Sequence, residues 1–364
     1  MTKVIKVGGF SHVKGIQIGG DCPVVVQTMW KERLSLSNLD EVIKKIEKLD
    51  VLGCGLLRFA VPDIETAEIF GILCGMTSMP LAADIHFDYK IALRCMDFPV
   101  AKIRINPGNI GAEEKVRAVL EKASEKNIPI RIGVNAGSLP SDLQRRVDEK
   151  EMTTACALAE AAGREISIFN EYGFKNFLVS MKSALIADNI EANRVLSQRT
   201  DAPFHIGVTE AGPLTAGVAR NTAAILALLN EGIGDTIRVS LSDSMENEVI
   251  AGREILASAS QLAPDNRRLK GGGVNIVSCP RCGRYGFDTC GFINRWNEKL
   301  YAINKDITVA VMGCEVNGPV EAKHAALGIT GAGNKVLIFK HGKIIKTIAA
   351  DQADAIFKKE LENL

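Results

Sequence analysis

The sequence predicts an α/β fold in which a (β/α)8 TIM barrel is followed by a small α+β domain. Eight short apolar runs alternate with amphipathic helical patterns through the first two-thirds of the 364 residues. Such runs are typical of parallel strands covered on both faces, and eight of them match the strand count of this barrel. A glycine-rich first turn, which marks the open doubly wound sheet, is not found. We therefore expect a closed barrel.

Two glycine-rich segments before the barrel predict a small hairpin. Residues Lys6–Gly9 and Val13–Gly20 each combine apolar residues with glycines that favour turns. We expect this hairpin to close the bottom of the barrel.

The barrel strands follow in chain order, each as a run of the length expected for a buried strand. They are predicted at Pro23–Met29, Gly55–Val61, Pro80–Phe87, Ala101–Asn106, Pro129–Asn135, Asn176–Lys182, Phe204–Glu210 and Asp235–Leu241. The segments between them have helical spacing. In Leu39–Leu49, for example, Val42, Ile46 and Leu49 fall on one face.

A segment rich in proline, arginine and glycine, Pro264–Gly273, predicts a linker after the barrel. We therefore place a barrel domain at residues 1–262 and a compact, cysteine-bearing domain at residues 263–364.

Polar side chains end the predicted strands. The C-terminal strand ends of a TIM barrel form its active site, so these side chains are candidate site residues. They are Arg58, Asp84, His86, Arg104, Asn106, Arg131, Asn135, Ser180, Lys182, His205, Glu210, Arg238, Ser240 and Ser242. Cations outnumber carboxylates, and several cations facing one cavity predict an anion with dispersed charge, such as a diphosphate. No Walker-type phosphate loop is present, which argues against a nucleoside triphosphate.

The overall charge argues against two classes of partner. The chain has 44 Lys and Arg against 43 Asp and Glu, so we expect no bulk nucleic-acid or membrane partner. No apolar run reaches the length of a membrane helix, and the first residues do not lead into a signal-peptide core. We expect a cytoplasmic protein, in which the nine cysteines do not form a disulfide framework.

Three cysteines near the C-terminus have the spacing of metal ligands. Cys279 and Cys282 form a Cys-x-x-Cys pair, and Cys314 follows in a separate segment. Three thiolates are one short of a closed zinc site, which Cys290 could complete. Iron–sulfur clusters usually have four cysteine ligands, so a three-cysteine site departs from that pattern too. The spacing alone leaves zinc and an iron–sulfur cluster equally open.

Motifs along nearly the whole chain resemble the 4-hydroxy-3-methylbut-2-enyl diphosphate synthase family. In the barrel they are Ile18–Gly20, Val25–Met29, Leu57–Pro62, Ala83–Phe87, Arg104–Asn109, Gly133–Leu139 and His205–Gly212. In the second domain they are Ser278–Arg284 and Met312–Ala322. So many separate matches in the same order make the resemblance specific, and they favour an iron–sulfur cluster over zinc.

The resemblance implies a [4Fe–4S] cluster held by three cysteines and one glutamate. In this chain these ligands fall on Cys279, Cys282, Cys314 and Glu321. A carboxylate is a hard ligand among soft thiolates and should leave iron more readily, which would free a coordination site.

Two departures from the family accompany this ligand set. Val320 stands where the family usually has glycine, and Cys290, which we expect to be inert, has no family counterpart. Glu315 is a weaker rival to Glu321 as the oxygen ligand.

The resemblance also implies the reaction. An enzyme of this family opens the ring of 2-C-methyl-D-erythritol 2,4-cyclodiphosphate reductively and removes a hydroxyl as water. The product is the isoprenoid precursor 4-hydroxy-3-methylbut-2-enyl diphosphate, and flavodoxin or ferredoxin donates the electrons. The family further implies a head-to-tail homodimer in which the cluster of one chain covers the barrel of the other.

Residue roles combine this resemblance with the polar residues at the strand ends. Glu210 is the expected acid/base, and Asp84, His86 and His205 are expected to position hydroxyls or shuttle protons. The expected substrate-binding residues are Arg58, Arg104, Asn106, Arg131, Asn135, Lys182, His205, Arg238 and Ser240.

Two other functions fit parts of the pattern. A zinc-stabilised barrel enzyme acting on a phosphorylated pterin or sugar would use the anion site, but it would not need three cysteines and a glutamate. A zinc-ribbon protein could bind RNA through Arg281, Arg284, Arg295, Lys299 and Lys305. Little aromatic interleaving for base stacking accompanies these residues, so we expect a solvated face.

Overall fold

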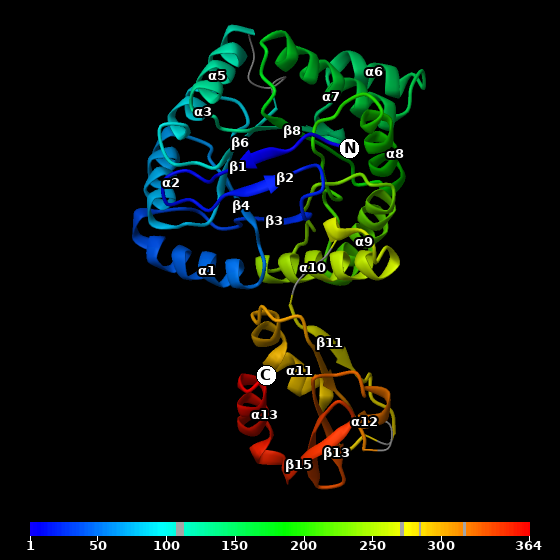
Figure 1. Cartoon of the computed structure of the whole chain (residues 1–364). Coiled ribbons are helices and arrows are strands. Elements are labelled where there is room, and N and C mark those ends of the chain that lie inside the picture. The colour runs from blue at the N-terminus through cyan, green and yellow to red at the C-terminus, as the bar shows by residue number, and fades with distance from the viewer. Residues whose placement is uncertain (107–112, 270–272, 284, 316–317) are drawn as a thin grey trace. The chain divides into compact units, whose positions relative to one another are not determined.

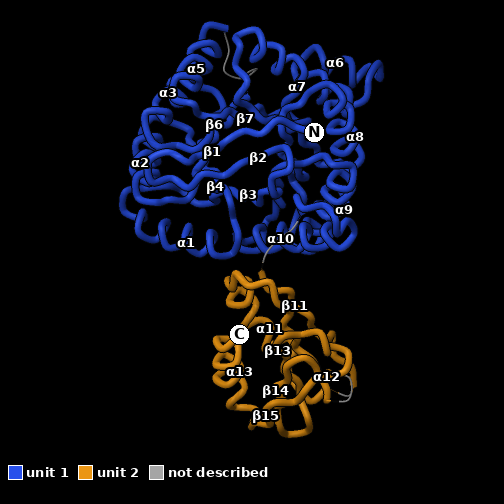
Figure 2. Tube along the Cα trace, viewed as in Figure 1, with its two compact units in different colours: residues 1–271 blue, residues 272–364 orange. Residues whose placement is uncertain are grey.

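The computed structural model describes residues 1–364 except 107–112, 270–272, 284 and 316–317. It divides the chain into two compact units, Met1–Gly271 and Gly272–Leu364, which Figure 2 shows in different colours. Each unit has its own sheet and core. Within the predicted linker, the 3₁₀ helix η3 (Arg267–Leu269) packs on the first unit, where Leu269 is buried and Val24 N–H donates to Arg268 O at 2.8 Å.

A parallel barrel forms the centre of the first unit, as predicted. The strand order is β8-β7-β6-β5-β4-β3-β10-β9. The two ends of this sheet meet where Val179 forms a parallel bridge with Phe204 and Val179 N–H donates to Pro203 O at 2.9 Å. The strands are β3 (Val25–Met29), β4 (Leu56–Ala60), β5 (Leu81–Asp84), β6 (Lys102–Ile105), β7 (Ile130–Asn135), β8 (Phe177–Lys182), β9 (His205–Ile206) and β10 (Thr236–Ile237).

Helices follow the strands and lie around the outside of the barrel (Figure 1). In α1, Val42, Ile46 and Leu49 are buried, which is the apolar stripe that its spacing predicts. Several helices are capped: Ser244 accepts from Asn247 N–H at the start of α10. The helices are α1 (Leu39–Val51), α2 (Ile64–Met76), α3 (Tyr89–Cys95), α5 (Glu113–Glu125), α6 (Ser141–Asp148), α7 (Thr154–Glu171), α8 (Ile186–Ser197), α9 (Leu214–Asn230) and α10 (Met245–Leu262).

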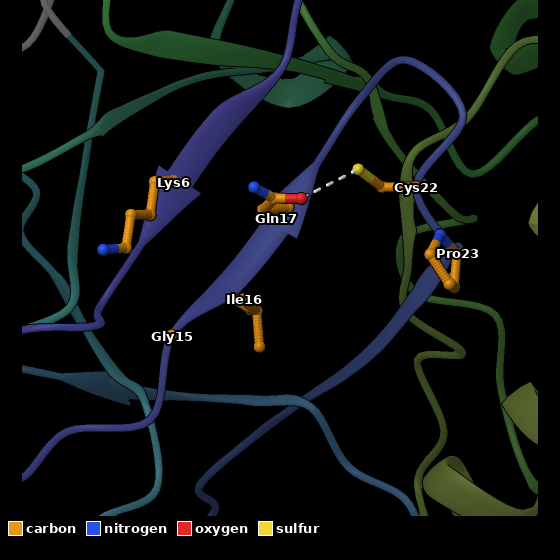
Figure 3. A pocket seen from close by; sticks show the side chains of 6 residues that line it. All are labelled: Lys6, Gly15, Ile16, Gln17, Cys22 and Pro23. Atoms are coloured by element: carbon orange, nitrogen blue, oxygen red, sulfur yellow. Dashed lines mark hydrogen bonds between the residues drawn. The ribbon is translucent and has the colours of Figure 1, made fainter.

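The predicted hairpin closes the barrel at the N-terminal ends of its strands. It consists of antiparallel β1 (Ile5–Val7) and β2 (Ile16–Ile18). Its apolar residues pack in one cluster with Leu56 and Ala82, at the starts of β4 and β5. Lys6 and Gln17 alternate with these residues and face outward. With Cys22 they line a shallow surface pocket of about 410 Å³, drawn in Figure 3.

Two barrel strands are shorter than predicted. The prediction extended the seventh strand to Glu210 and the eighth to Leu241, whereas β9 and β10 have two residues each. Gly207, with φ of +148°, follows β9, and a Cβ there would lie 2.2 Å from the carbonyl oxygen of Arg238. The chain leaves the ladder at this close approach, so Glu210 and Arg238 lie on loops rather than on strands.

The second unit is a small α+β domain, as predicted. Its sheet has the order β11-β12-β13-β14-β15, in which the first three strands are parallel and the last three antiparallel. Phe292 and Trp296 of α11 pack with Phe357 of α13 in its core. The elements are β11 (Asn275–Ser278), α11 (Thr289–Tyr301), β12 (Thr308–Val311), α12 (Gly318–Glu321), β13 (Leu327–Ala332), β14 (Lys335–Lys340), β15 (Lys343–Ala349), η4 (Ala350–Gln352) and α13 (Ala353–Glu362).

The helices were also compared with the requirements of a membrane span. None of those that the structure describes is both long and apolar enough to cross a bilayer.

Candidate active site

A cavity of about 190 Å³ lies at the C-terminal ends of the barrel strands. It gathers most of the polar residues that the sequence places at strand ends. The lining residues are Met29, Arg58, Asp84, His86, Arg104, Arg131, Gly133, Asn135, Ser180, Lys182, Thr209, Arg238 and Ser240. The position of this cavity is the one that active sites of TIM barrels occupy.

Strand register explains why the charged side chains meet. Asp84 pairs with Arg104 across β5 and β6, and Arg104 pairs with Arg131 across β6 and β7. Residues at the same level of neighbouring strands project to the same face, so these three side chains point together into the barrel mouth.

Asp84 is the carboxylate that lines the cavity, and it has three partners. Arg104 Nη1 donates to Asp84 Oδ1 at 3.0 Å, Arg58 Nε lies 3.4 Å from Oδ2, and His86 Nε2 lies 3.5 Å from Oδ1. Burial would raise the pKa of Asp84, but Arg58, His86, Arg104 and Arg131 outweigh it and hold that pKa well below its usual range. Asp84 is therefore ionised at neutral pH.

The cations of the cavity are only partly neutralised. Arg58, Arg104, Arg131, Lys182 and Arg238 all line it. Burial, opposed by Asp84, lowers the pKa of Arg58 to about 10, so this guanidinium remains charged at neutral pH.

Several buried guanidinium donors have no hydrogen-bond partner among the described residues. They are Nε and Nη1 of Arg131 and Nε of Arg104; Nε of Arg58 also lacks a hydrogen bond, although it lies within ion-pair distance of Asp84. Arg131 is 2% exposed, and burial together with the nearby Arg58 and Arg104 lowers its pKa well below the usual value. Buried donors are normally satisfied, so these groups indicate a site that an anionic ligand completes.

Gly133 makes room for this arrangement. A Cβ at Gly133 would lie 2.6 Å from Nε of Arg104 and 3.0 Å from its Nη2. Any other residue would push the Arg104 guanidinium out of its position between Asp84 and the cavity. A glycine inside a strand indicates such a close approach, but sequence reasoning did not single it out.

Lys102 and His205 lie buried beside the cationic group without lining the cavity. Lys102 Nζ donates to Gln27 Oε1 at 3.2 Å, and His205 Nδ1 contacts Thr236 Oγ1 at 2.7 Å. Burial lowers the pKa of both groups well below their usual values, and Arg131 and Arg58 add to the effect for each. The structure therefore places His205, a predicted substrate-binding residue, in the core as a neutral imidazole.

Three further predicted residues, Asn106, Glu210 and Ser242, also lie outside the cavity lining, and Ser242 is exposed on the loop after β10. Asn106 is buried just after β6, and the following motif residues 107–109 lie outside the described part of the chain. Glu210 is exposed on the loop after β9, where its φ is +52°. A non-glycine residue in this left-handed region carries backbone strain, and such strain clusters at functional sites. Its neighbour Thr209 does line the cavity.

Glu248 of α10 is a buried carboxylate that sequence reasoning missed. It lies behind the cavity wall and contacts Arg238, with Nε 3.5 Å from Oε2, and Lys31, with Nζ 2.9 Å from Oε1. Leu241 N–H donates to Oε1 at 2.9 Å, and Thr28 Oγ1 contacts Oε2. A glutamate on a helix with several other acidic residues carries no sequence signal of burial.

The predicted cysteine site lies at the C-terminal ends of two parallel strands of the second unit. Cys279 follows β11, and its N–H donates to Val311 O at 2.9 Å. A Cβ at Gly313, which precedes Cys314, would lie 3.4 Å from Cys279 Sγ, so the two cysteine segments are adjacent. Cys279 also packs against an apolar cluster that includes Ala322, which follows Glu321 at the end of α12.

The four predicted ligands are open to solvent. Cys279 and Cys314 are half-buried, while Cys282 and Glu321 are exposed. Among the described residues, no group of three or more His, Cys, Asp and Glu side chains is close enough to hold a single metal ion. The structure therefore brings the ligand-bearing segments together without gathering the four side chains around one point.

Comparison with known protein families covers both units. Residues 8–253 match the GcpE TIM-barrel domain, and residues 275–363 match the GcpE protein C-terminal domain.

Three curated relatives share the name 4-hydroxy-3-methylbut-2-en-1-yl diphosphate synthase (flavodoxin). That of Treponema pallidum (strain Nichols) is 50% identical, over 100% of this chain and 92% of its own length. The Treponema denticola protein (strain ATCC 35405) is 48% identical, over 100% of this chain and 99% of its own length. The Clostridium acetobutylicum protein (strain ATCC 824) is 40% identical, again over 100% and 99%. The similarity thus extends through both the barrel and the cysteine-bearing domain.

Proposed function

The chain belongs to the GcpE family, and from this premise we propose that it reduces 2-C-methyl-D-erythritol 2,4-cyclodiphosphate to 4-hydroxy-3-methylbut-2-enyl diphosphate. The reaction consumes two electrons and one proton, opens the cyclic diphosphate at carbon and releases one water. The observation that supports this substrate class is the set of buried guanidinium donors in the barrel mouth that lack a partner among the described residues.

Substrate binding is assigned to the cations around the cavity. Arg58, Arg104 and Arg131 present forked donors to the diphosphate, with Lys182 as an additional point charge. Asp84 accepts from Arg104 and so holds that guanidinium in place before the substrate arrives. A site whose donors are already oriented loses little entropy when the ligand binds. Asn135, Ser240 and Arg238 are assigned to the remaining polar atoms of the substrate.

Proton chemistry is assigned to Glu210 and to the pair of Asp84 and His86. Glu210 supplies the proton to the hydroxyl that leaves as water, and its exposed position lets it recover a proton from solvent. His86, whose side chain is 47% exposed, contacts Asp84 and Arg104 and positions a substrate hydroxyl at the cavity edge. His205 and Asn106 do not line the cavity, so no direct contact with the substrate is assigned to them.

The cofactor is proposed to be a [4Fe–4S] cluster held by Cys279, Cys282, Cys314 and Glu321. The chemistry of these donors fits such a group, because three thiols and a carboxylate lie on neighbouring segments and no ion pair joins any of the four to another described residue. When bound, the cluster supplies electrons singly and offers one iron with a labile oxygen ligand. Backbone contacts of this chain hold the loops: Gly286 N–H donates to Gly313 O at 2.7 Å, and Gly318 N–H to Cys314 O at 3.0 Å.

Flavodoxin is the proposed electron donor, because the relatives' names include it, and ferredoxin is the alternative. We also propose a head-to-tail homodimer in the cytoplasm, in which each active site combines the barrel of one chain with the cluster of the other. Mixed dimers of Cys314→Ser and Glu210→Gln chains test this arrangement. Activity should return in one of the two composite sites, whereas sites built within one chain would show no recovery.

The first experiment on the proposed function is Mössbauer spectroscopy of anaerobically purified, iron-57-labelled protein, with a turnover assay on the cyclic diphosphate. One iron distinct from three sulfur-ligated irons is expected. Glu321→Gln should change the signal of the distinct iron, and the matched variant Glu315→Gln should not. Four equivalent irons would implicate Cys290 as a ligand, and stoichiometric zinc without iron would refute the redox function.

A further inference from the structure

Glu248 contacts both Arg238 in the cavity wall and residues in and after the neighbouring strands β3 and β10. It is 1% exposed and sits on α10, while its contacts come from Thr28 of β3, from Lys31 two residues after β3 and from the loop after β10. Oε1 accepts from Leu241 N–H and contacts Lys31, and Oε2 contacts Thr28 and the Nε of Arg238. Both oxygens are thus fully used, and the buried charge faces two cations.

Arg238 is the member of this network that lines the cavity. Its Nε is directed at Glu248, and its Nη1 lies 3.7 Å from Met29 Sδ. Because Nε is engaged behind the wall, the guanidinium is fixed in orientation with its far end toward the cavity. Asp84 and Glu248 therefore act on different cations: Asp84 lines the cavity beside Arg58 and Arg104, and Glu248 orients Arg238 without touching the cavity.

Glu248 also influences the charge of the cavity at longer range. Burial lowers the pKa of Lys182 well below its usual value, Arg238, Arg131 and Arg58 add to this effect, and the carboxylate of Glu248 opposes it. Removal of Glu248 would therefore leave Arg238 unpaired and make Lys182 harder to keep protonated.

We propose that Glu248 is a positioning residue for substrate binding, which acts by holding the Arg238 guanidinium toward the diphosphate. The proposal rests on the function proposed above, because it takes the cavity as the diphosphate site. It assigns no contact between Glu248 and the substrate.

A purely structural role is the rival explanation, and the geometry separates the two. The Lys31 arm joins Glu248 to the backbone oxygens of Leu241 and Asp243 and so ties the loop after β10 to the end of β3. The Arg238 arm leads to the cavity. Lys31→Met removes the contacts of Lys31 with Glu248 and with the loop, and leaves the contact between Glu248 and Arg238 in place. It is therefore the matched control.

The test is a double-mutant cycle read by calorimetric binding of inorganic pyrophosphate to the holoenzyme. In Glu248→Gln one oxygen becomes an amide NH₂, which cannot accept from Arg238 Nε while the other oxygen keeps Leu241 N–H. We expect the Kd to rise about tenfold in the wild-type background and less than about twofold in the Arg238→Met background. Lys31→Met should change the Kd less than about twofold while lowering the thermal midpoint.

Equal losses in both backgrounds would overturn the proposal, because Glu248 would then act without Arg238. A loss in Lys31→Met as large as in Glu248→Gln would overturn it too, in favour of the loop. If Glu248→Gln does not fold, Glu248→Asp in the same cycle gives the answer, since the shorter carboxylate keeps its charge but withdraws from Arg238. Pyrophosphate reports this coupling whether or not the enzyme turns over the cyclic diphosphate, so failure of the proposed reaction is distinguishable from failure of this inference.

For the cyclic diphosphate itself, KM should rise about tenfold in Glu248→Gln while kcat changes less than about threefold. A fall in kcat with KM unchanged would contradict a positioning role in binding.

Discussion

The barrel mouth and the cysteine loops differ in how their proposed functional side chains are held. In the barrel, the charged residues stand on strands, are mostly buried and are held by one another, as in the contacts of Asp84 with Arg58 and Arg104. In the second unit, Cys282 and Glu321 are exposed on a loop and a short helix. The difference is that contacts between side chains of the same chain organise the charged residues of the barrel, whereas the proposed cluster ligands Cys282 and Glu321 are left open to solvent.

If the two regions act independently, replacement of a proposed ligand cysteine should cause the largest loss of turnover. The same change should leave substrate binding by the barrel unaffected. Cys314→Ser should lower turnover by roughly 10²-fold or more, because the cofactor is lost or misassembled. The Kd for the cyclic diphosphate should stay within about twofold of wild type. Iron analysis, a turnover assay and calorimetry measure these effects. Cys290→Ser is the control, in which iron content, turnover and the Kd should stay unchanged. A parallel loss of substrate binding would break the comparison.

Next in size is the loss of the proposed acid. Glu210→Gln should lower kcat by about 10²–10⁴-fold, because proton transfer to the leaving hydroxyl is lost. Binding should be spared, since Glu210 does not line the cavity. Single-turnover kinetics and calorimetry on the same preparation check both statements. Near-normal turnover would remove Glu210 from the mechanism.

For Arg131, we expect one substitution to weaken anion binding and to stabilise the ligand-free protein. Its Nε and Nη1 have no partner among the described residues, and like charges surround it. Arg131→Met should weaken pyrophosphate binding by about 10²-fold, since charge-assisted hydrogen bonds are lost. The same change should stabilise the free protein by about 1–3 kcal/mol, because a buried unpaired charge is removed. A urea titration without ligand measures the second effect, and destabilisation would show that Arg131 is already satisfied.

The effect expected to change activity least is a change in the pH dependence of stability. Burial lowers the pKa of Lys102 in the folded protein well below its unfolded value. Between these two pKa values the unfolded chain binds a proton that the folded chain does not, so stability rises with pH by about 1.4 kcal/mol per unit. Lys102→Met should flatten this slope over the pH range below about 10. An unchanged slope would mean that Lys102 is charged in the fold.

Sequence patterns were sufficient for the barrel because each strand is an apolar run that both faces of a parallel sheet bury. They were also sufficient for Arg58, Arg104, Arg131 and Lys182, since polar residues at such strand ends have few structural roles. They did not predict the lengths of β9 and β10, because the chain leaves the ladder where Gly207 comes close to the carbonyl oxygen of Arg238, on the loop after β10.

The placement of Glu248 and His205 was not predictable for a related reason. Whether a polar side chain faces the cavity or the core depends on packing against residues distant in sequence, such as Arg238 for Glu248 and Thr236 for His205. For the cysteines, spacing left zinc and iron–sulfur ligation open, and only the resemblance along the whole chain favoured one of them.

The hairpin of β1 and β2 has a kinetic consequence. Because its apolar face packs against the barrel where the strands begin, the described residues close the barrel on the side away from the cavity. A product that keeps the diphosphate must leave by the route through which the next substrate enters. Until it leaves, it occupies the guanidinium donors that the next substrate needs. Product should therefore inhibit competitively, and the exchange of one diphosphate for another at this opening sets an upper limit on the rate of turnover.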